Sequence, residues 1–199
     1  MRWLTLRAIP ALLLLGSAAF AVTPSLTPID LQPESRLWFS GTSTVRSFEC
    51  SATDFEAKVD ALPDAVNGVL NGDKSVTAVE LRISTARLDC KNGTMNEHML
   101  KALKANENPT IVFKLTSYEL AKVSDAVRVS LNGTLSLGGV DRPIIMTANA
   151  TQGTGGALRV AGTHELKMKE WGLKPPTLML GTMKVDERIK VGFDLVLKG

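Results

Sequence analysis

The sequence predicts an all-β protein, a barrel or closed sandwich of about eight antiparallel strands, with one amphipathic helix. Three observations support this fold class. Apolar residues alternate with polar ones over many short segments, turn-forming residues separate these segments, and only one segment has helical spacing. Closure of the sheet is expected because it removes exposed strand edges.

The N-terminus predicts a secretory signal peptide over residues 1–21. Arg2 and Arg7 precede a short apolar run, and small residues follow up to Ala21. The run is shorter than the roughly 20 apolar residues that cross a bilayer. We therefore expect one exported domain over residues 22–199, periplasmic or secreted and not membrane-spanning.

The strands are expected where apolar residues recur at every second position. The clearest case is the segment from Val127 to Leu137, which has one apolar and one polar face. Turns are expected at Asn71-Gly72-Asp73 and at Gly138-Gly139, because these residues give the backbone the freedom that tight turns need. Four further segments have the same alternation, namely residues 55–59, 79–83, 111–115 and 191–197.

The helix is expected near residues 95–105, within the sequence TMNEHMLKALKA that starts at Thr94. Met95, Met99 and Leu103 fall on one side of such a helix. Thr94 and Glu97 have the spacing of a capping box, which predicts the helix start at Thr94. The helix is expected to cover an end or a seam of the sheet.

The mature chain has two cysteines, Cys50 and Cys90. In an exported protein an even pair predicts a disulfide, which would stabilise the fold by roughly 4 kcal/mol in the chain-entropy model. A redox-active or metal-binding pair is the weaker alternative, because no CxxC spacing occurs.

Charge and motifs argue against a nucleic-acid partner and against catalysis. Without Arg2 and Arg7 the 23 basic residues become 21, against 20 acidic ones, so the surface is nearly neutral. The two histidines, His98 and His164, have no partners at metal-ligand spacing, and GxSxG and phosphate-binding glycine motifs are absent. We expect no enzymatic activity and no resident metal.

The segment from Trp171 to Met183, WGLKPPTLMLGTM, is an apolar loop stiffened by Pro175 and Pro176. A contiguous apolar surface of this kind is normally hidden or used for binding. Two interpretations stay open: the loop plugs the end of a solid barrel, or it rims a cavity for an apolar ligand.

Four stretches of the chain resemble the YceI-like proteins, and together they cover most of residues 35–198. They are STVRSFECSATDFEAKV from Ser43, MNEHMLKALKANENPTIVFKLTSYE from Met95, LNGTLSLGGVDRPIIM from Leu131 and MKEWGLKPPTLMLGTMKVDERIKVGFDLVL from Met168. One departure is Gly138, which stands where the family commonly has a histidine.

The resemblance implies an eight-stranded antiparallel lipocalin-like barrel with a helical lid and an elongated apolar cavity. It also implies an exported binding protein that sequesters or carries a long-chain isoprenoid or a quinone-like lipid, with no cofactor besides that lipid. The side chains expected to enclose the tail come from the strands, the helix and the apolar loop. They are Met99, Leu103, Phe113, Val129, Leu131, Trp171, Leu178, Met179, Leu180 and Met183.

A second hypothesis is an interaction module, related to envelope stress, with a solid core and an apolar loop that docks onto a partner. The sequence leaves both a monomer and a homodimer open.

Overall fold

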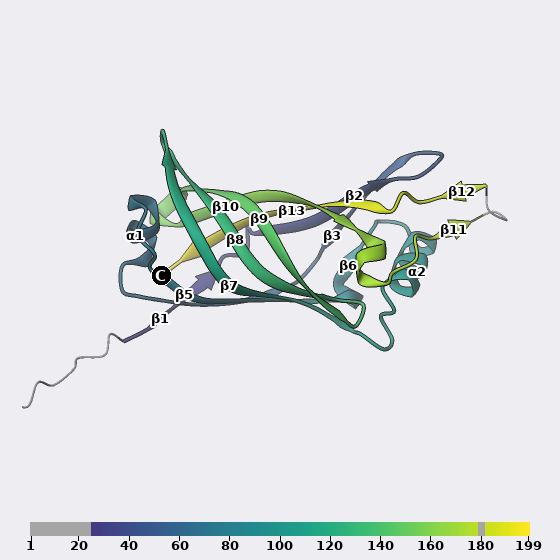
Figure 1. The fold of residues 1–199 in the computed structure, drawn as a ribbon, viewed down its shortest axis with the longest axis horizontal. Helices are drawn as coiled ribbons and strands as arrows, with labels where there is room; N and C mark the ends of the chain where they lie inside the picture. Colours follow the sequence, from purple (N-terminus) through teal and green to yellow (C-terminus); the bar gives the residue numbers. More distant parts are fainter. Residues whose placement is uncertain (1–24, 179–181) are drawn as a thin grey trace, which may run out of the picture.

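A computed structural model describes residues 25–178 and 182–199 of the chain. Within these residues, eight antiparallel strands form a closed ring in the order β1-β4-β5-β7-β8-β9-β10-β13 (Figure 1). The pairs Asp30↔Lys198 and Leu31↔Leu197 between β1 and β13 close the ring. The predicted eight-stranded antiparallel barrel is confirmed.

The ring strands differ in length, and the longest make a hairpin ladder along one side. They are β1 (Thr27–Leu31), β4 (Glu56–Ala61), β5 (Val76–Ser84), β7 (Thr110–Val123), β8 (Ala126–Leu137), β9 (Val140–Gln152), β10 (Leu158–Lys167) and β13 (Arg188–Lys198). A bulge between Leu115 and Ser117 shifts the register of β7 against β8. Gly138 and Gly139 connect β8 to β9 with positive φ values of 58° and 82°, a conformation that favours glycine.

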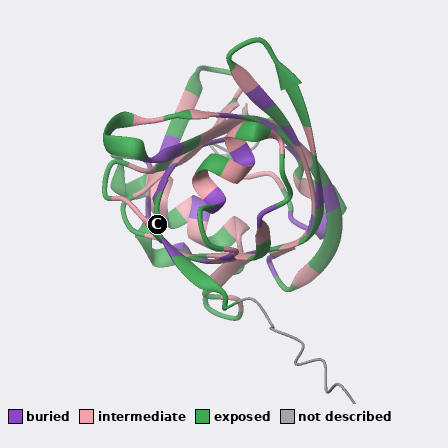
Figure 2. Ribbon diagram, turned by 90° about the vertical axis from the view of Figure 1, so that its left-hand side faces the viewer, coloured by how far each residue is buried: buried purple, intermediate pink, exposed green. Residues whose placement is uncertain are grey.

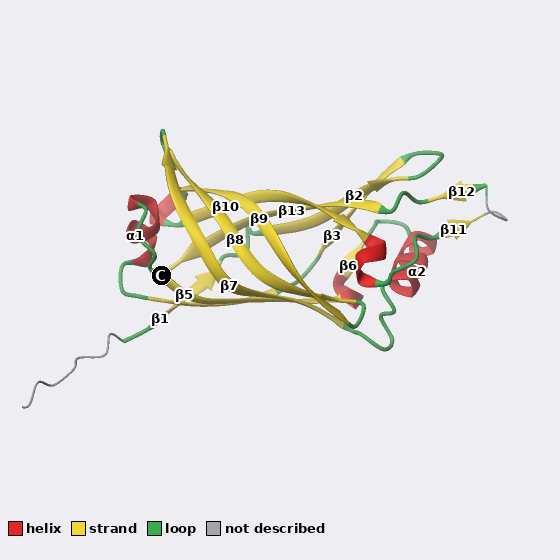
Figure 3. Cartoon of the chain, viewed as in Figure 1, coloured by secondary structure: helices red, strands yellow, loops and turns green. Residues whose placement is uncertain are grey.

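The barrel wall is extended beyond the ring by three strands on the N-terminal half of β13. They are β2 (Arg36–Thr42), β3 (Ser47–Ala52) and β6 (Leu88–Asp89), joined in that order. A separate two-stranded ribbon, β11 (Thr177–Leu178) and β12 (Met183–Lys184), lies beside the tip of the β2–β3 hairpin (Figure 3). The Ser43↔Val185 bridge joins the hairpin to the segment that follows this ribbon.

Two α-helices, not one, occur among the described residues, and they lie at opposite ends of the barrel (Figure 1). The helix that the sequence analysis missed, α1 (Ala65–Asn71), has only seven residues, and buries Ala65 and Val69. It ends at Gly72, whose φ of 91° allows the chain to turn back while Asp73 N–H donates to Gly68 O. Three short 3₁₀ turns also occur, at Thr85–Arg87, Thr154–Gly156 and Met168–Trp171.

The predicted helix is present as α2 (Gly93–Ala102), but the predicted capping box is wrong. The N-cap is Asn92, whose Oδ1 accepts a hydrogen bond from Met95 N–H at 3.0 Å. Asparagine is as good an N-cap as threonine, and Asn92 lies two residues earlier, so Thr94 falls inside the first turn. The helix ends before the predicted Ala105, because Lys104 has a φ of 53°.

Buried residues form three clusters. Figure 2 shows buried positions, in purple, at several places around the barrel wall. The first lies near α1 and includes Val69, Tyr118 and Val129. The second includes Trp171 and Leu173 after β10, and the third surrounds the disulfide next to α2. The predicted alternation of β8 is confirmed, because Val127 and Val129 are buried while Arg128 between them is exposed.

Candidate functional site

The barrel encloses a cavity of about 670 Å³. This volume lies within the roughly 300–1,000 Å³ of typical small-ligand sites. An eight-stranded barrel can fill its interior or hold one small ligand, and this barrel leaves space. The second hypothesis, an interaction module, requires a solid core, and this part of it is therefore wrong.

The inward side chains of the strands make the walls of the cavity. They are mostly Leu, Val and Ile, as the period-two alternation predicts. Examples from five ring strands are Leu81 of β5, Phe113 of β7, Leu131 of β8, Met146 of β9 and Val191 of β13. Such a lining is complementary to hydrocarbon and offers few hydrogen-bond partners.

The α1 end of the cavity is largely apolar. Val69 of α1 lines it together with Tyr118. The Tyr118 hydroxyl oxygen accepts a hydrogen bond from Val76 N–H at 2.9 Å, and burial raises the pKa of the phenol. This hydrogen bond gives the phenol oxygen a partner within the protein.

The α2 end of the cavity is built by the helix and by the segment after β10. Met95, Met99 and Leu103 line it from the helix side. Trp171 is 1% exposed, and its indole N–H donates to Leu135 O at 3.1 Å, which ties the ring to β8. Exposed residues such as Arg46 also line the cavity at this end, so the cavity reaches the surface here.

Most of the predicted ligand-binding residues meet at this cavity. Those that line it are Met99, Leu103, Phe113, Val129, Leu131, Trp171 and Met183. Leu178 lies in β11 opposite Met183. Met179 and Leu180 lie outside the described residues.

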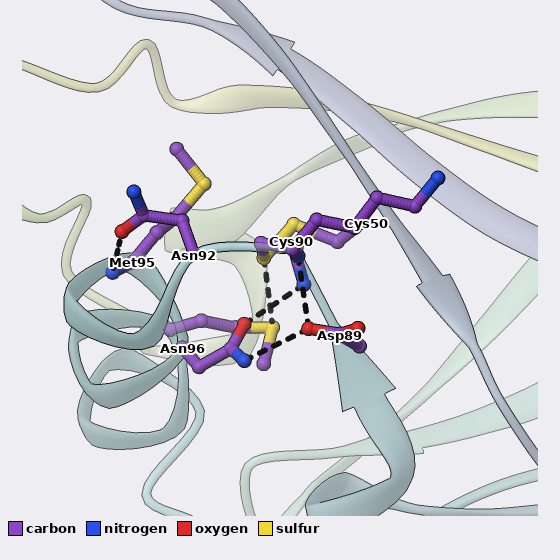
Figure 4. The surroundings of a disulfide bond; sticks show 8 residues. Cys50, Asp89, Cys90, Asn92, Met95 and Asn96 are labelled. Carbon is purple, nitrogen blue, oxygen red and sulfur yellow. Dashed lines mark hydrogen bonds between the residues drawn. A yellow bond between two sulfur atoms is a disulfide. The ribbon is translucent and has the colours of Figure 1, made fainter.

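The predicted disulfide between Cys50 and Cys90 is present and lines the cavity (Figure 4). It joins β3 to the residue after β6, just before α2. Asn96 of α2 braces the same corner: its Oδ1 accepts from Cys90 N–H and its Nδ2 donates to Asp89 (Figure 4). The hydrogen bond from Asn96, together with one from Lys91 N–H, lowers the pKa of Asp89.

Sequence reasoning missed the basic side chains of the lining. Arg46 of the β2–β3 hairpin, His98 of α2 and His164 of β10 all face the cavity. Burial lowers the pKa of His164, although Glu165 and Glu170 oppose this shift. The sequence did contain a signal for His164, because inward side chains of a strand recur at every second position. His164 is separated from the inward Leu158 and Leu166 of the same strand by an even number of positions.

No group of three or more His, Cys, Asp or Glu side chains that could hold a metal occurs among the described residues. In the same part of the chain, none of the helices has the length and apolar character needed to cross a bilayer.

These features define a class of protein, a closed β-barrel with a largely apolar internal cavity. The family model for the YceI-like domain matches residues 31–197, and the chain belongs to this family. No curated protein matches the chain.

Solved structures share the fold at low sequence identity. BcnA of Burkholderia cenocepacia has a TM-score of 0.66 at 16% identity, covering 84% of this chain and 99% of its own. A polyisoprenoid-binding domain from Saccharophagus degradans has a TM-score of 0.61 at 13% identity, covering 89% and 99%. The YceI protein of Campylobacter jejuni has a TM-score of 0.56 at 18% identity, covering 75% and 84%.

Proposed function

We propose that this protein is an exported, non-enzymatic binding protein that sequesters or carries a long-chain isoprenoid or quinone-like lipid inside its barrel. The observation that carries the proposal is the cavity of about 670 Å³ with an almost wholly apolar lining. The relative from Saccharophagus degradans, described as a polyisoprenoid-binding domain, supports the same ligand class.

The energetics of such a complex are favourable. Burial of hydrocarbon contributes about 0.8 kcal/mol per methylene, so ten buried carbons contribute roughly 8 kcal/mol before the costs of association and ordering. A longer chain buries more methylenes and so offsets those costs. A net binding free energy of roughly 8 kcal/mol corresponds to about micromolar affinity. The tail therefore supplies most of the affinity, as expected for a carrier.

Export is proposed from the sequence of residues 1–21, which lie outside the described residues. The Cys50–Cys90 disulfide supports it, because such bonds persist in oxidising compartments such as the periplasm or the extracellular space. In an aqueous compartment of this kind, a lipid that has left the membrane requires a protein that shields its hydrocarbon chain from water.

The ligand-binding residues are proposed to act in two groups. Phe113, Val129 and Leu131 pack along the tail from the wall. Met99, Leu103, Trp171 and Met183 enclose it at the α2 end. Leu178, Met179 and Leu180 are proposed as further contacts from their apolar sequence alone.

Intrinsic fluorescence tests the proposal directly. Apart from Trp3, the tryptophans of the chain are Trp38 and Trp171, and both line the cavity. Titration with geranylgeraniol is expected to change their emission saturably, with an affinity of about micromolar or tighter. The control is an alcohol with a single isoprene unit, which has the same head group and buries little hydrocarbon.

Equal responses to the two alcohols, or no saturable response to geranylgeraniol, would contradict the proposal. Single replacement of Trp38 by Phe keeps one reporter in the cavity and checks that the signal arises inside the barrel.

A further inference from the structure

The β2–β3 hairpin ends in an exposed apolar side chain, that of Val45. Its exposed fraction, 65%, is the highest among the large apolar side chains that are exposed in the described part of the chain. Tight turns normally use glycine, proline or small polar residues at such a place. The turn is held by Ser43, whose Oγ accepts from Val45 N–H at 3.3 Å and from Arg46 N–H at 3.1 Å. The turn therefore does not need the valine side chain, which is free to contact a partner.

The tip of this hairpin is braced by the β11–β12 ribbon beside it (Figure 3). Thr44 N–H donates to Lys184 O at 3.0 Å, and Lys184 N–H donates to Thr44 Oγ1 at 3.3 Å. The Thr44 hydroxyl donates in turn to Thr182 O at 3.0 Å. We call residues 43–46 and 182–185, which these hydrogen bonds join, the hairpin–ribbon tip. Because its backbone is already held in place, docking of this tip costs little ordering entropy.

The charged side chains of the hairpin–ribbon tip are both positive. Arg46 and Lys184 are exposed, and neither makes an ion pair within the described residues. Residues 36–48 and 171–185 of the sequence contain no aspartate or glutamate. The carboxylate of Asp186, the nearest acidic residue in the chain, accepts a hydrogen bond from Arg188 N–H at 2.8 Å. An exposed apolar side chain flanked by unpaired cations suits a partner with an anionic surface and an apolar interior.

The β7–β8 hairpin at the α1 end of the barrel provides a comparison within the same molecule. Its tip also exposes a valine, Val123, at 45%, but the same turn contains the acidic Asp125. None of the described residues 121–128 lines the cavity, whereas Ser43 and Arg46 of the hairpin–ribbon tip do. A partner bound at the hairpin–ribbon tip therefore lies next to the opening of the cavity, and a partner bound at the β7–β8 tip does not.

We infer that the hairpin–ribbon tip is a docking surface for an anionic phospholipid membrane. Val45 inserts among the lipid chains at the membrane surface, while Arg46 and Lys184 contact the lipid phosphates. This inference goes beyond the proposed function, because it concerns a bilayer held at the outside of the barrel and not a ligand within it. Docking in this orientation places the cavity opening against the membrane, where a lipid can be exchanged.

The test is co-sedimentation of the protein with phospholipid vesicles that contain no polyprenyl ligand. Vesicles of equal parts phosphatidylglycerol and phosphatidylcholine are compared with vesicles of phosphatidylcholine alone. The wild type is expected to bind the anionic vesicles at least about tenfold more tightly, and less tightly as salt screens the charges. Arg46→Gln with Lys184→Gln, and separately Val45→Asp, should each weaken this binding at least about tenfold.

The control variants make the same changes at the other hairpin. They are Lys122→Gln with Arg128→Gln, and Val123→Asp, all at exposed positions near the β7–β8 tip. Their binding to anionic vesicles should stay within about twofold of the wild type. The affinity of Val45→Asp for geranylgeraniol should also stay within about twofold, which shows that the barrel is intact.

Equal binding of the wild type to both kinds of vesicle, or equal losses in the tip and control variants, would overturn the inference. So would a wild type that binds no vesicles and forms a dimer that Val45→Asp dissociates, because the tip would then contact a second copy of the chain. Each of these results leaves the proposed function intact if geranylgeraniol still binds. Loss of geranylgeraniol binding by the wild type would overturn the proposed function and not the docking surface.

Discussion

Removal of the disulfide should destabilise the fold by an amount that follows from the chain topology. Cys50 and Cys90 are 40 residues apart in sequence, and they are 1% and 8% exposed. Besides this bond, β6 is held to β3 by only two residue pairs, Ser51↔Asp89 and Ala52↔Leu88. The covalent link therefore restricts the segment that carries α2.

The magnitude can be worked out from the loop length. In the chain-entropy model, closing a loop of 40 residues removes denatured-state entropy that is equivalent to about 4 kcal/mol at 25 °C. For a domain of this size, a loss of about 4 kcal/mol lowers the melting temperature by roughly 8–16 °C. The effect acts mainly through the unfolded chain, so it does not require a change in the barrel.

The assay is urea unfolding of the oxidised wild type, of the reduced wild type and of the double variant Cys50→Ala, Cys90→Ala. The reduced wild type retains both sulfur atoms and is the matched control for lost packing. Both should unfold more easily than the oxidised protein by about 4 kcal/mol. A loss below about 1 kcal/mol in both would refute this reasoning.

Three further predictions concern the lining. Leu131→Asp should weaken geranylgeraniol binding about 100-fold, because an unpaired carboxylate against the tail costs roughly 3 kcal/mol. The control Ile145→Asp, at a 64% exposed position on β9, should leave the affinity within about twofold. Equal losses of affinity in the two variants would contradict the assignment of Leu131 to the inner face. Trp171→Phe should lower the free energy of unfolding by about 1–3 kcal/mol, since it leaves Leu135 O without its donor; an unchanged urea midpoint would argue against this role. Because burial lowers the pKa of folded His164, the unfolded chain takes up this proton more readily, and stability falls as the pH drops below about 6.5. His164→Gln should remove that part of the acid sensitivity in thermal melts at pH 7.5 and pH 5, and identical pH profiles would disprove it.

The sequence allowed the inner faces of the strands to be predicted well, because alternation reports directly which side of a pleated strand is apolar. Leu81, Phe113, Val129 and Leu131 all line the cavity as the pattern implies. Alternation could not reveal that the interior is hollow, since inward leucines look the same whether they meet one another or surround space. That distinction depends on the diameter of the closed ring, which sequence periodicity does not encode.

The helices show where local signals were insufficient. The helix α1 (Ala65–Asn71) has seven residues, too short for a periodic pattern, and includes Gly68, a poor helix former. For α2, Asn92 and Thr94 are both residue types that cap helices, and the sequence alone favoured the wrong one.

The three basic side chains of the cavity lining were harder to place from the sequence for a different reason. Arg46, His98 and His164 are far apart in the chain, and each resembles an ordinary polar residue in its own segment. Only the folded barrel brings them to one cavity.

Native mass spectrometry of the protein, isolated from its own compartment without detergent, tests the central claim most directly. The account predicts a mass above that of the polypeptide, removed by organic extraction and identified as a long-chain lipid. Repeated observation of the bare polypeptide mass, with no adduct after incubation with polyprenols or quinones, would contradict it.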